Sequence, residues 1–164
     1  MQKPTLFLLL MSMMLLSGCV TIAKSPDGAV FGEDFSELTF EMGVTDSVSL
    51  GSATTQEYRI GDVAQYSDGV VTKIFTWASK SPKTLLVKAG ERTAVFAQMD
   101  KKYGAPGFSP TTNNYCTNGS RFTPQPNTRY RIIQTGDAAV GCVLKVTDSE
   151  TDRVPDDLEK VLFE

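Results

Sequence analysis

The sequence predicts an all-β fold, an antiparallel β-sandwich of about seven to nine strands. Short apolar or alternating runs recur along the chain, and Gly, Pro, Asn, Asp and Ser separate them. Helical periodicity is scarce, and no internal repeat of about 20 to 50 residues is present. Because the chain has 164 residues, 41% of them hydrophobic, we expect one domain with a single core.

Runs rich in β-branched and aromatic residues mark the candidate strands. In chain order the candidates are Ala29–Phe31, Leu38–Met42, Ser47–Leu50, Tyr58–Ile60, Val70–Trp77, Thr84–Lys88, Thr93–Met99, Arg129–Gln134 and Val140–Val146, with Tyr115 and Cys116 as a short edge piece.

Two turns that contain glycine predict hairpins. Ala89-Gly90-Glu91 separates two apolar runs, and a glycine at this point supplies the positive φ that such turns require. Thr135-Gly136-Asp137 separates the last two strong runs in the same way. After it, alternation places Cys142, Leu144 and Val146 on one face, which we expect to be the core face.

The C-terminal segment VPDDLEKVLFE carries the best helix signal. Pro155 suits the first turn, two aspartates follow near the positive end of the helix dipole, and three apolar residues would share one face. A final edge strand over Lys160 to Phe163 is the competing prediction. Residues 103–128 are rich in Gly, Pro and Asn, so we expect a long loop between the two hairpins.

Charge and composition disfavour several classes of function. The formal net charge is −3, a poor match for nucleic acid, and the chain has no histidine for triads or metal ligation. Ser79–Lys83 offers a serine and lysines, but Pro82 indicates a turn. Asp148–Asp152 begins like a calcium loop yet lacks the loop glycine and the distal glutamate. We therefore predict no catalytic residue, no metal and no cofactor.

The first 18 residues have the form of a secretory signal. Lys3 is the only charge, and the apolar run from Leu6 to Leu16 would cover about half of a ~30 Å hydrocarbon core at ~1.5 Å per residue. The end of this run and the three residues after it, Leu16-Ser17-Gly18-Cys19, resemble the lipobox of bacterial lipoproteins. The resemblance implies removal of residues 1–18 and attachment of diacylglycerol and a further acyl chain, such as palmitate, at Cys19. A simple secretory signal with an unrelated cysteine is the alternative.

The same resemblance implies the organisation and the cellular location of the mature chain. Residues 19–28 would be a lipidated tether, and residues 29–164 the sandwich domain. In enterobacterial lipoproteins an aspartate after the cysteine favours retention in the inner membrane, and here the residue is Val20. We therefore expect a lipid anchor in the outer membrane, facing the periplasm, with the inner membrane as the alternative.

With Cys19 assigned to lipid, Cys116 and Cys142 remain as an even pair in an oxidising compartment. An even number of cysteines in such a compartment predicts a disulfide between them. Two separate buried thiols or a redox pair are the alternatives. No Cys-x-x-Cys supports the redox alternative. If Cys142 points into the core, the bond ties its strand to the segment carrying Cys116, as a disulfide joins the two sheets of a sandwich.

Part of the domain also resembles a group of known domains. The segments VKAGERTAVFA, YC, RFTPQPNTRYRI and GCVLKV, over residues 84–147, are loosely similar to immunoglobulin-like or transthyretin-like domains of bacterial lipoproteins. The resemblance implies a small sandwich with one disulfide and no assigned chemistry.

Aromatic and arginine residues in and beside the long loop form the candidate recognition surface, because such side chains carry much of the energy of protein interfaces. They are Tyr103, Phe108, Tyr115, Arg121, Phe122 and Arg129. The alternative is that they fold back and cap the end of the sandwich.

Together these observations predict a binding or structural module of the cell envelope with a protein partner. Inhibition of a host hydrolase such as lysozyme, an accessory role in a secretion system, and an envelope enzyme are the alternatives.

Overall fold

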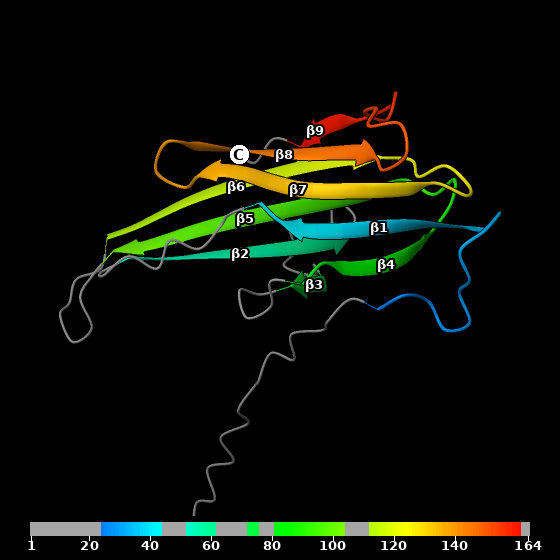
Figure 1. Ribbon diagram of the computed structural model, residues 1–164, viewed down its shortest axis with the longest axis horizontal. Helices are drawn as coiled ribbons and strands as arrows, with labels where there is room; N and C mark the ends of the chain where they lie inside the picture. Colours follow the sequence, from blue (N-terminus) through cyan, green and yellow to red (C-terminus); the bar gives the residue numbers. More distant parts are fainter. Residues whose placement is uncertain (1–23, 44–51, 62–71, 76–80, 104–111, 162–164) are drawn as a thin grey trace, which may run out of the picture.

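The computed structural model describes residues 24–43, 52–61, 72–75, 81–103 and 112–161, and these residues form a β-sandwich (Figure 1). The predicted fold class is confirmed. Within these residues the strands are β1 (Phe35–Met42), β2 (Ser52–Gly61), β3 (Thr72–Phe75), β4 (Lys83–Lys88), β5 (Thr93–Tyr103), β6 (Thr112–Phe122), β7 (Arg129–Asp137), β8 (Gly141–Asp148) and β9 (Glu159–Val161).

The strands divide into two sheets that lie face to face (Figure 1). One sheet has the order β4-β1-β7-β8, and the other has the order β3-β2-β5-β6-β9. Neighbouring strands are antiparallel except β1 and β7, which run parallel with Glu37 opposite Arg129. The first strand therefore pairs with one that is far away in the sequence.

Alternating side chains from both sheets build the core. In β1, Leu38 and Phe40 point inward, and in β7 Tyr130 and Ile132 do the same, as period two requires. Leu144 and Val146 of β8 are buried on the same side, which confirms the core face predicted for that strand. The core cluster comprises Leu38, Phe40, Tyr58, Leu85, Val95, Ala97, Phe122, Tyr130, Ile132, Leu144 and Val146.

The turn at Ala89-Gly90-Glu91 does not form a hairpin, and that prediction is wrong. β4 pairs with β1 and β5 pairs with β2 and β6, so the turn carries the chain from one sheet to the other. Gly90 has a φ of 76°, as the sequence predicts, but its N–H donates to the Pro124 carbonyl at 2.9 Å. Hydrogen bonds to distant segments thus determine the partner of each flanking strand.

The predicted hairpin between the last two strong runs is confirmed as β7–β8, with its turn at residues 138–140 rather than at Thr135-Gly136-Asp137. Gly136 lies inside the ladder opposite Cys142, with a φ of 112°. A Cβ added there would come within 2.4 Å of the Gly141 carbonyl oxygen, so glycine is required by a close approach of two backbones.

The expected long loop over residues 103–128 is wrong in its middle, because β6 runs through it and pairs with β5 along its whole length. Tyr115 and Cys116 are part of this strand. Its inward side chains include polar ones, and Asn118 Nδ2 donates to the Cys142 carbonyl of β8 in the other sheet. A segment rich in Asn, Thr and Gly therefore forms a strand through its pairing with β5 and its contacts with the facing sheet, despite its weak strand propensity.

Two other expectations fail. The C-terminal helix is wrong: β9 forms an edge strand on β6, in agreement with the competing prediction, because Glu159 pairs with Arg92 and Arg121 and Leu158 packs against the core. Ala29–Phe31 is not a strand, since Ala29 donates to the Pro26 carbonyl in a turn. The predicted strand Ser47–Leu50 and Trp77 lie outside the described residues.

Candidate functional site: the disulfide and its groove

The Cys116–Cys142 disulfide joins β6 of one sheet to β8 of the other, with the two Cα atoms 6.1 Å apart. Both the predicted pairing and its role in joining the sheets are confirmed. β8 is an edge strand, and β9 pairs with β6 only from Gly119 to Arg121. The disulfide therefore lies at the side of the sandwich, where both sheets present an edge.

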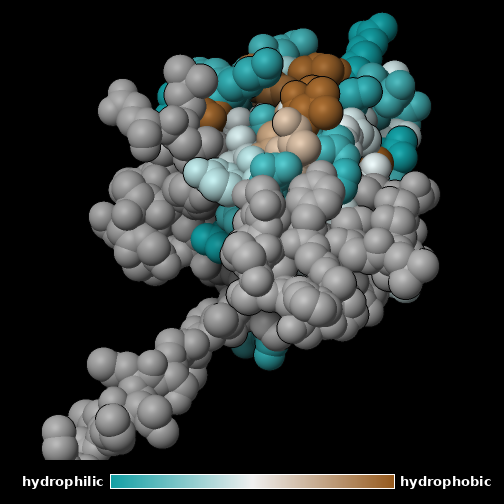
Figure 2. All heavy atoms as spheres, turned by 90° about the vertical axis from the view of Figure 1, so that its left-hand side faces the viewer, coloured by the Kyte–Doolittle hydropathy of each residue, from teal (hydrophilic) through white to brown (hydrophobic). Residues whose placement is uncertain are grey.

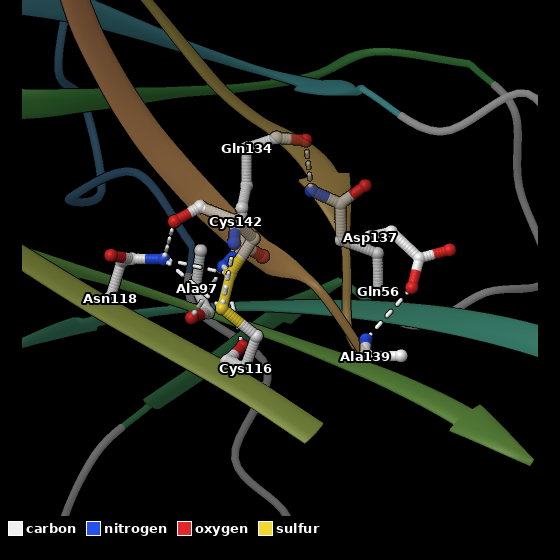
Figure 3. The surroundings of a disulfide bond; sticks show 8 residues. All are labelled: Gln56, Ala97, Cys116, Asn118, Gln134, Asp137, Ala139 and Cys142. Atoms are coloured by element: carbon white, nitrogen blue, oxygen red, sulfur yellow. Dashed lines mark hydrogen bonds between the residues drawn. A yellow bond between two sulfur atoms is a disulfide. The ribbon is translucent and has the colours of Figure 1, made fainter. Parts of the chain in front are cut away.

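Two amide side chains surround the sulfur atoms (Figure 3). Asn118 Nδ2 donates to Cys142 Sγ at 2.8 Å and to the Cys142 carbonyl oxygen at 3.1 Å. Gln134 Nε2 donates to the same sulfur at 3.0 Å. The N–H of Cys142 donates to Cys116 Sγ at 3.1 Å, so both sulfur atoms accept hydrogen bonds.

Gln134 connects this site to a polar network in the core. Its backbone N–H donates to Tyr58 Oη at 2.8 Å, and its backbone carbonyl accepts from Gln56 Nε2 at 3.0 Å. Tyr58 Oη in turn donates to the Glu41 carbonyl at 2.6 Å. Burial raises the pKa of Tyr58 well above its ordinary value, which keeps the hydroxyl protonated as a donor. The network holds β2, β1 and β7 together behind the disulfide.

Gly43, next to the end of β1, closes the other side of this network. Its N–H donates to Gln56 Oε1 at 3.2 Å. A Cβ at this position would lie 1.9 Å from the Gln134 carbonyl oxygen, so no larger residue fits without moving the backbone.

A groove of about 440 Å³ opens beside the disulfide between the two sheet edges. Its lining residues come from β6, β8 and β9: Tyr115, Thr117, Asn118, Gly119, Ser120, Cys142, Val143, Leu144, Lys160 and Val161. Tyr115 and Val143 are 73% and 53% exposed, and Val140 in the β7–β8 turn is 91% exposed. We call these three exposed residues the apolar rim. Figure 2 views the end of the molecule at which the β7–β8 turn lies and shows apolar residues there among hydrophilic ones.

The predicted recognition residues whose side chains the structure describes do not gather on one surface. Tyr115 is exposed and belongs to the apolar rim, whereas Phe122 is fully buried in the core. The assignment of Phe122 to a recognition surface is therefore wrong, and its folded-back position agrees with the alternative. The Tyr103 side chain and Phe108 lie outside the described residues, as does the proposed lipidation site Cys19.

The two predicted arginines are engaged in ion pairs. Arg121 pairs with Glu159 of β9 at 2.8 Å. Arg129 lies 4.3 Å from the centre of the Phe31 ring and pairs with Glu37 at 3.4 Å. Both hold neighbouring segments together, Arg121 between β6 and β9 and Arg129 between β7 and β1.

A larger and more polar cavity, about 600 Å³, lies at the end of the sandwich where β6 leads into β7 and β8 leads toward β9. Its lining includes Tyr130, Asp148, Arg153 and Asp157. The Asp148 carboxylate accepts the N–H groups of Thr151 and Glu150 at 2.9 and 2.8 Å, and these bonds hold its pKa below the ordinary value. Asp148 thus caps a turn. No group of three potential metal-ligating side chains occurs among the described residues.

Sequence reasoning missed the residues that shape the site: Gln56, Asn118 and Gln134. A signal for Gln134 was available, since it follows Tyr130 and Ile132 at period two and so occupies a core position. Gln56 precedes Tyr58 on the same face. Glutamine at a core position indicates a buried polar network, because its amide must find hydrogen-bonding partners.

None of the described residues forms a helix long and apolar enough to cross a membrane. Comparisons with models of protein families, with curated proteins and with solved structures find no match for this chain.

Proposed function

We propose that this protein is a lipoprotein anchored in the outer membrane, and that its periplasmic sandwich acts by binding a protein partner rather than by catalysis. The observation that carries the proposal is Leu16-Ser17-Gly18-Cys19 at the end of a short apolar run. The Cys116–Cys142 bond supports it, because disulfides persist in oxidising compartments such as the periplasm.

The strength of the proposed anchor depends on how many acyl chains enter the bilayer. Each buried methylene contributes about 0.8 kcal/mol, and one chain alone gives only marginal binding. A cysteine carrying a diacylglycerol and an acylated amino group supplies more than one chain at one residue. Such an anchor keeps the sandwich at the membrane without a spanning segment.

The apolar rim is the proposed contact for the partner. Exposed apolar residues surrounded by polar ones mark protein interfaces, and tyrosine is enriched there. Tyr115 and Val143 also line the groove, so the rim offers both a surface and a recess. The neighbouring Lys160 gives the groove a positive charge and no carboxylate opposes it among the described lining residues.

The anchor is tested in a bacterium that expresses the full chain. Globomycin should cause the precursor to accumulate, and Cys19→Ser should release the protein from the membrane fraction. If globomycin leaves processing unchanged and the Cys19→Ser variant stays membrane-bound, the lipoprotein assignment is wrong.

The surface is tested by photo-cross-linking in whole cells. A photoreactive residue at Tyr115 or Val143 should give a discrete adduct with another envelope protein. The same photoreactive residue at Lys83 should give no such adduct. Lys83 is exposed in β4, the edge strand on the opposite side of the four-stranded sheet from β8. Equal labelling at all three positions, or none at the rim, would count against the proposed surface.

A further inference from the structure

We propose that the Cys116–Cys142 disulfide is a thiol-exchange site from which Cys142 leaves as a thiolate held by two amide side chains. Asn118 and Gln134 donate to Cys142 Sγ at 2.8 and 3.0 Å. Among the described residues, the donors near Cys116 Sγ are the backbone N–H of Cys142 at 3.1 Å and the Asn118 amide at 3.7 Å. The donors therefore favour negative charge on Cys142 over negative charge on Cys116.

These hydrogen bonds matter most after the disulfide opens. A neutral sulfur is a weak acceptor, so N–H donors add little to the oxidised form. A thiolate carries a full charge, and hydrogen bonds to charged acceptors are roughly twice as strong as those between neutral groups. The same two amides therefore stabilise the reduced form more than the oxidised form, and they make Cys142 the better leaving group.

The burial of Gln134 is the second observation. The residue is fully buried, and its Oε1 is the one described buried side-chain oxygen or nitrogen without a hydrogen-bonding partner. Its Nε2, by contrast, reaches Cys142 Sγ, the Ala97 carbonyl at 3.2 Å and the Cys116 carbonyl at 3.4 Å. An apolar residue of similar size would avoid an unpaired buried acceptor. A glutamine is nevertheless accommodated here because its Nε2 donates to Cys142 Sγ, and this hydrogen bond offsets the cost of the unpaired Oε1.

The disulfide is not sealed inside the core. Cys142 and Asn118 line the groove, and Cys116, the cysteine that is attacked, is itself half-buried rather than enclosed. Of the charged groups near the site, Lys160 of β9 lines the groove and favours a thiolate, and Lys101 of β5 neutralises the Asp137 carboxylate of β7. No described lining residue of the groove is acidic.

The exchange step balances without a further oxidant. The thiolate of a small thiol, or of a cysteine in another protein, attacks Sγ of Cys116. A new S–S bond forms between them, the Cys116–Cys142 bond breaks, and its electron pair leaves on Cys142 Sγ. Reversal of the step by the Cys142 thiolate restores the intramolecular disulfide and releases the thiol.

The first test measures the equilibrium with reduced and oxidised glutathione. The full chain carries Cys19→Ser so that Cys116 and Cys142 are the two countable thiols, and mass spectrometry after alkylation counts them. At a pH above the pKa of both thiols, Gln134→Met and Asn118→Leu should each lower the equilibrium constant for reduction by about tenfold, since each removes a donor to the thiolate. Ser36→Ala is the control, because Ser36 is equally buried but donates to the Gln125 carbonyl at 2.6 Å, six residues along β1 from Met42, the residue paired with Gln134. Equal constants in all variants would overturn the proposal.

The second test does not depend on the folding of the core variants. In the Cys19→Ser background, Cys116→Ser leaves Cys142 as the single thiol and Cys142→Ser leaves Cys116. The pH dependence of alkylation should give Cys142 a pKa at least one unit below that of Cys116, whose value should lie near the ordinary 8.5. A Cys142 pKa equal to or above that of Cys116 would refute Cys142 as the leaving thiolate.

Discussion

Phe122 at the end of β6 meets Tyr130 near the start of β7 edge to face, with ring centroids 4.9 Å apart and an interplanar angle of 65°. The two strands belong to different sheets, so this contact crosses the core. Tyr130 Oη also accepts the N–H of Gln125 at 3.0 Å, which fixes the connection between the strands. The pair holds the chain where it passes from one sheet to the other.

Replacing Phe122 with alanine should lower the free energy of unfolding by about 3–5 kcal/mol, because a fully buried ring leaves a cavity. Tyr130→Phe keeps the ring and removes only the hydroxyl, so it should cost about 0.5–1.5 kcal/mol. Urea denaturation followed by circular dichroism measures both. A Phe122→Ala loss below that of Tyr130→Phe would contradict the core position of Phe122.

Gly43→Ala should destabilise the fold because its Cβ would lie 1.9 Å from the Gln134 carbonyl oxygen. Gly32→Ala is the matched control, since the nearest atom to a Cβ there is 4.0 Å away. We expect a loss of at least about 2 kcal/mol for the first substitution and under about 0.5 kcal/mol for the second. Thermal denaturation of the two variants side by side provides the comparison, and equal melting temperatures would argue against the close approach.

Removing the disulfide with Cys116→Ala and Cys142→Ala together should cost about 3.5 kcal/mol in the chain-entropy model for a separation of 26 residues. The loss should appear in the denaturation midpoint of the double variant. Wild-type protein kept under reducing agent should show a loss of similar size. Unchanged stability in both would mean that the bond does not restrict the unfolded chain.

Stability should fall at acid pH partly through Asp148. The Thr151 and Glu150 N–H groups stabilise its carboxylate in the folded state, so the folded pKa lies below the unfolded value of 3.8. Its contribution is therefore present above about pH 4 and is lost as the pH falls through the folded pKa. Asp148→Asn keeps an acceptor oxygen without the charge, so its stability should change less between pH 6 and pH 3 than that of the wild type. An identical change in both proteins would contradict this role.

Local patterns predicted the strands that alternate clearly and the pairing of the two cysteines. β7 and β8 followed because Tyr130, Ile132, Leu144 and Val146 alternate cleanly on either side of a short turn. The disulfide was predicted from the number of cysteines and from the oxidising compartment that the lipobox resemblance implies. These features depend on residues near one another in sequence or on simple counting.

The failures have one physical origin. A turn at Gly90 fixes the local backbone but not the partner of either strand, and that partner depends on Asp34 and Pro124, which bond to the turn from far away. β6 is polar and contains Gly119, yet it forms because β5 offers eleven residues of matched register. The amides of Asn118 and Gln134 likewise come close to Cys142 only in the folded structure, so their spacing along the chain does not indicate that they donate to its sulfur atom.

The parallel pairing of β1 with β7 has a consequence for the time course of folding. Connections β2–β3, β5–β6 and β7–β8 stay within one sheet, and every other connection crosses between sheets. Contacts between distant residues dominate such a topology, and high contact order slows folding. The four-stranded sheet cannot be completed until β7 has been synthesised, because β7 is the other inner strand of the sheet and pairs with β1. The first strand of a nascent chain therefore waits for its central partner until most of the chain has been made.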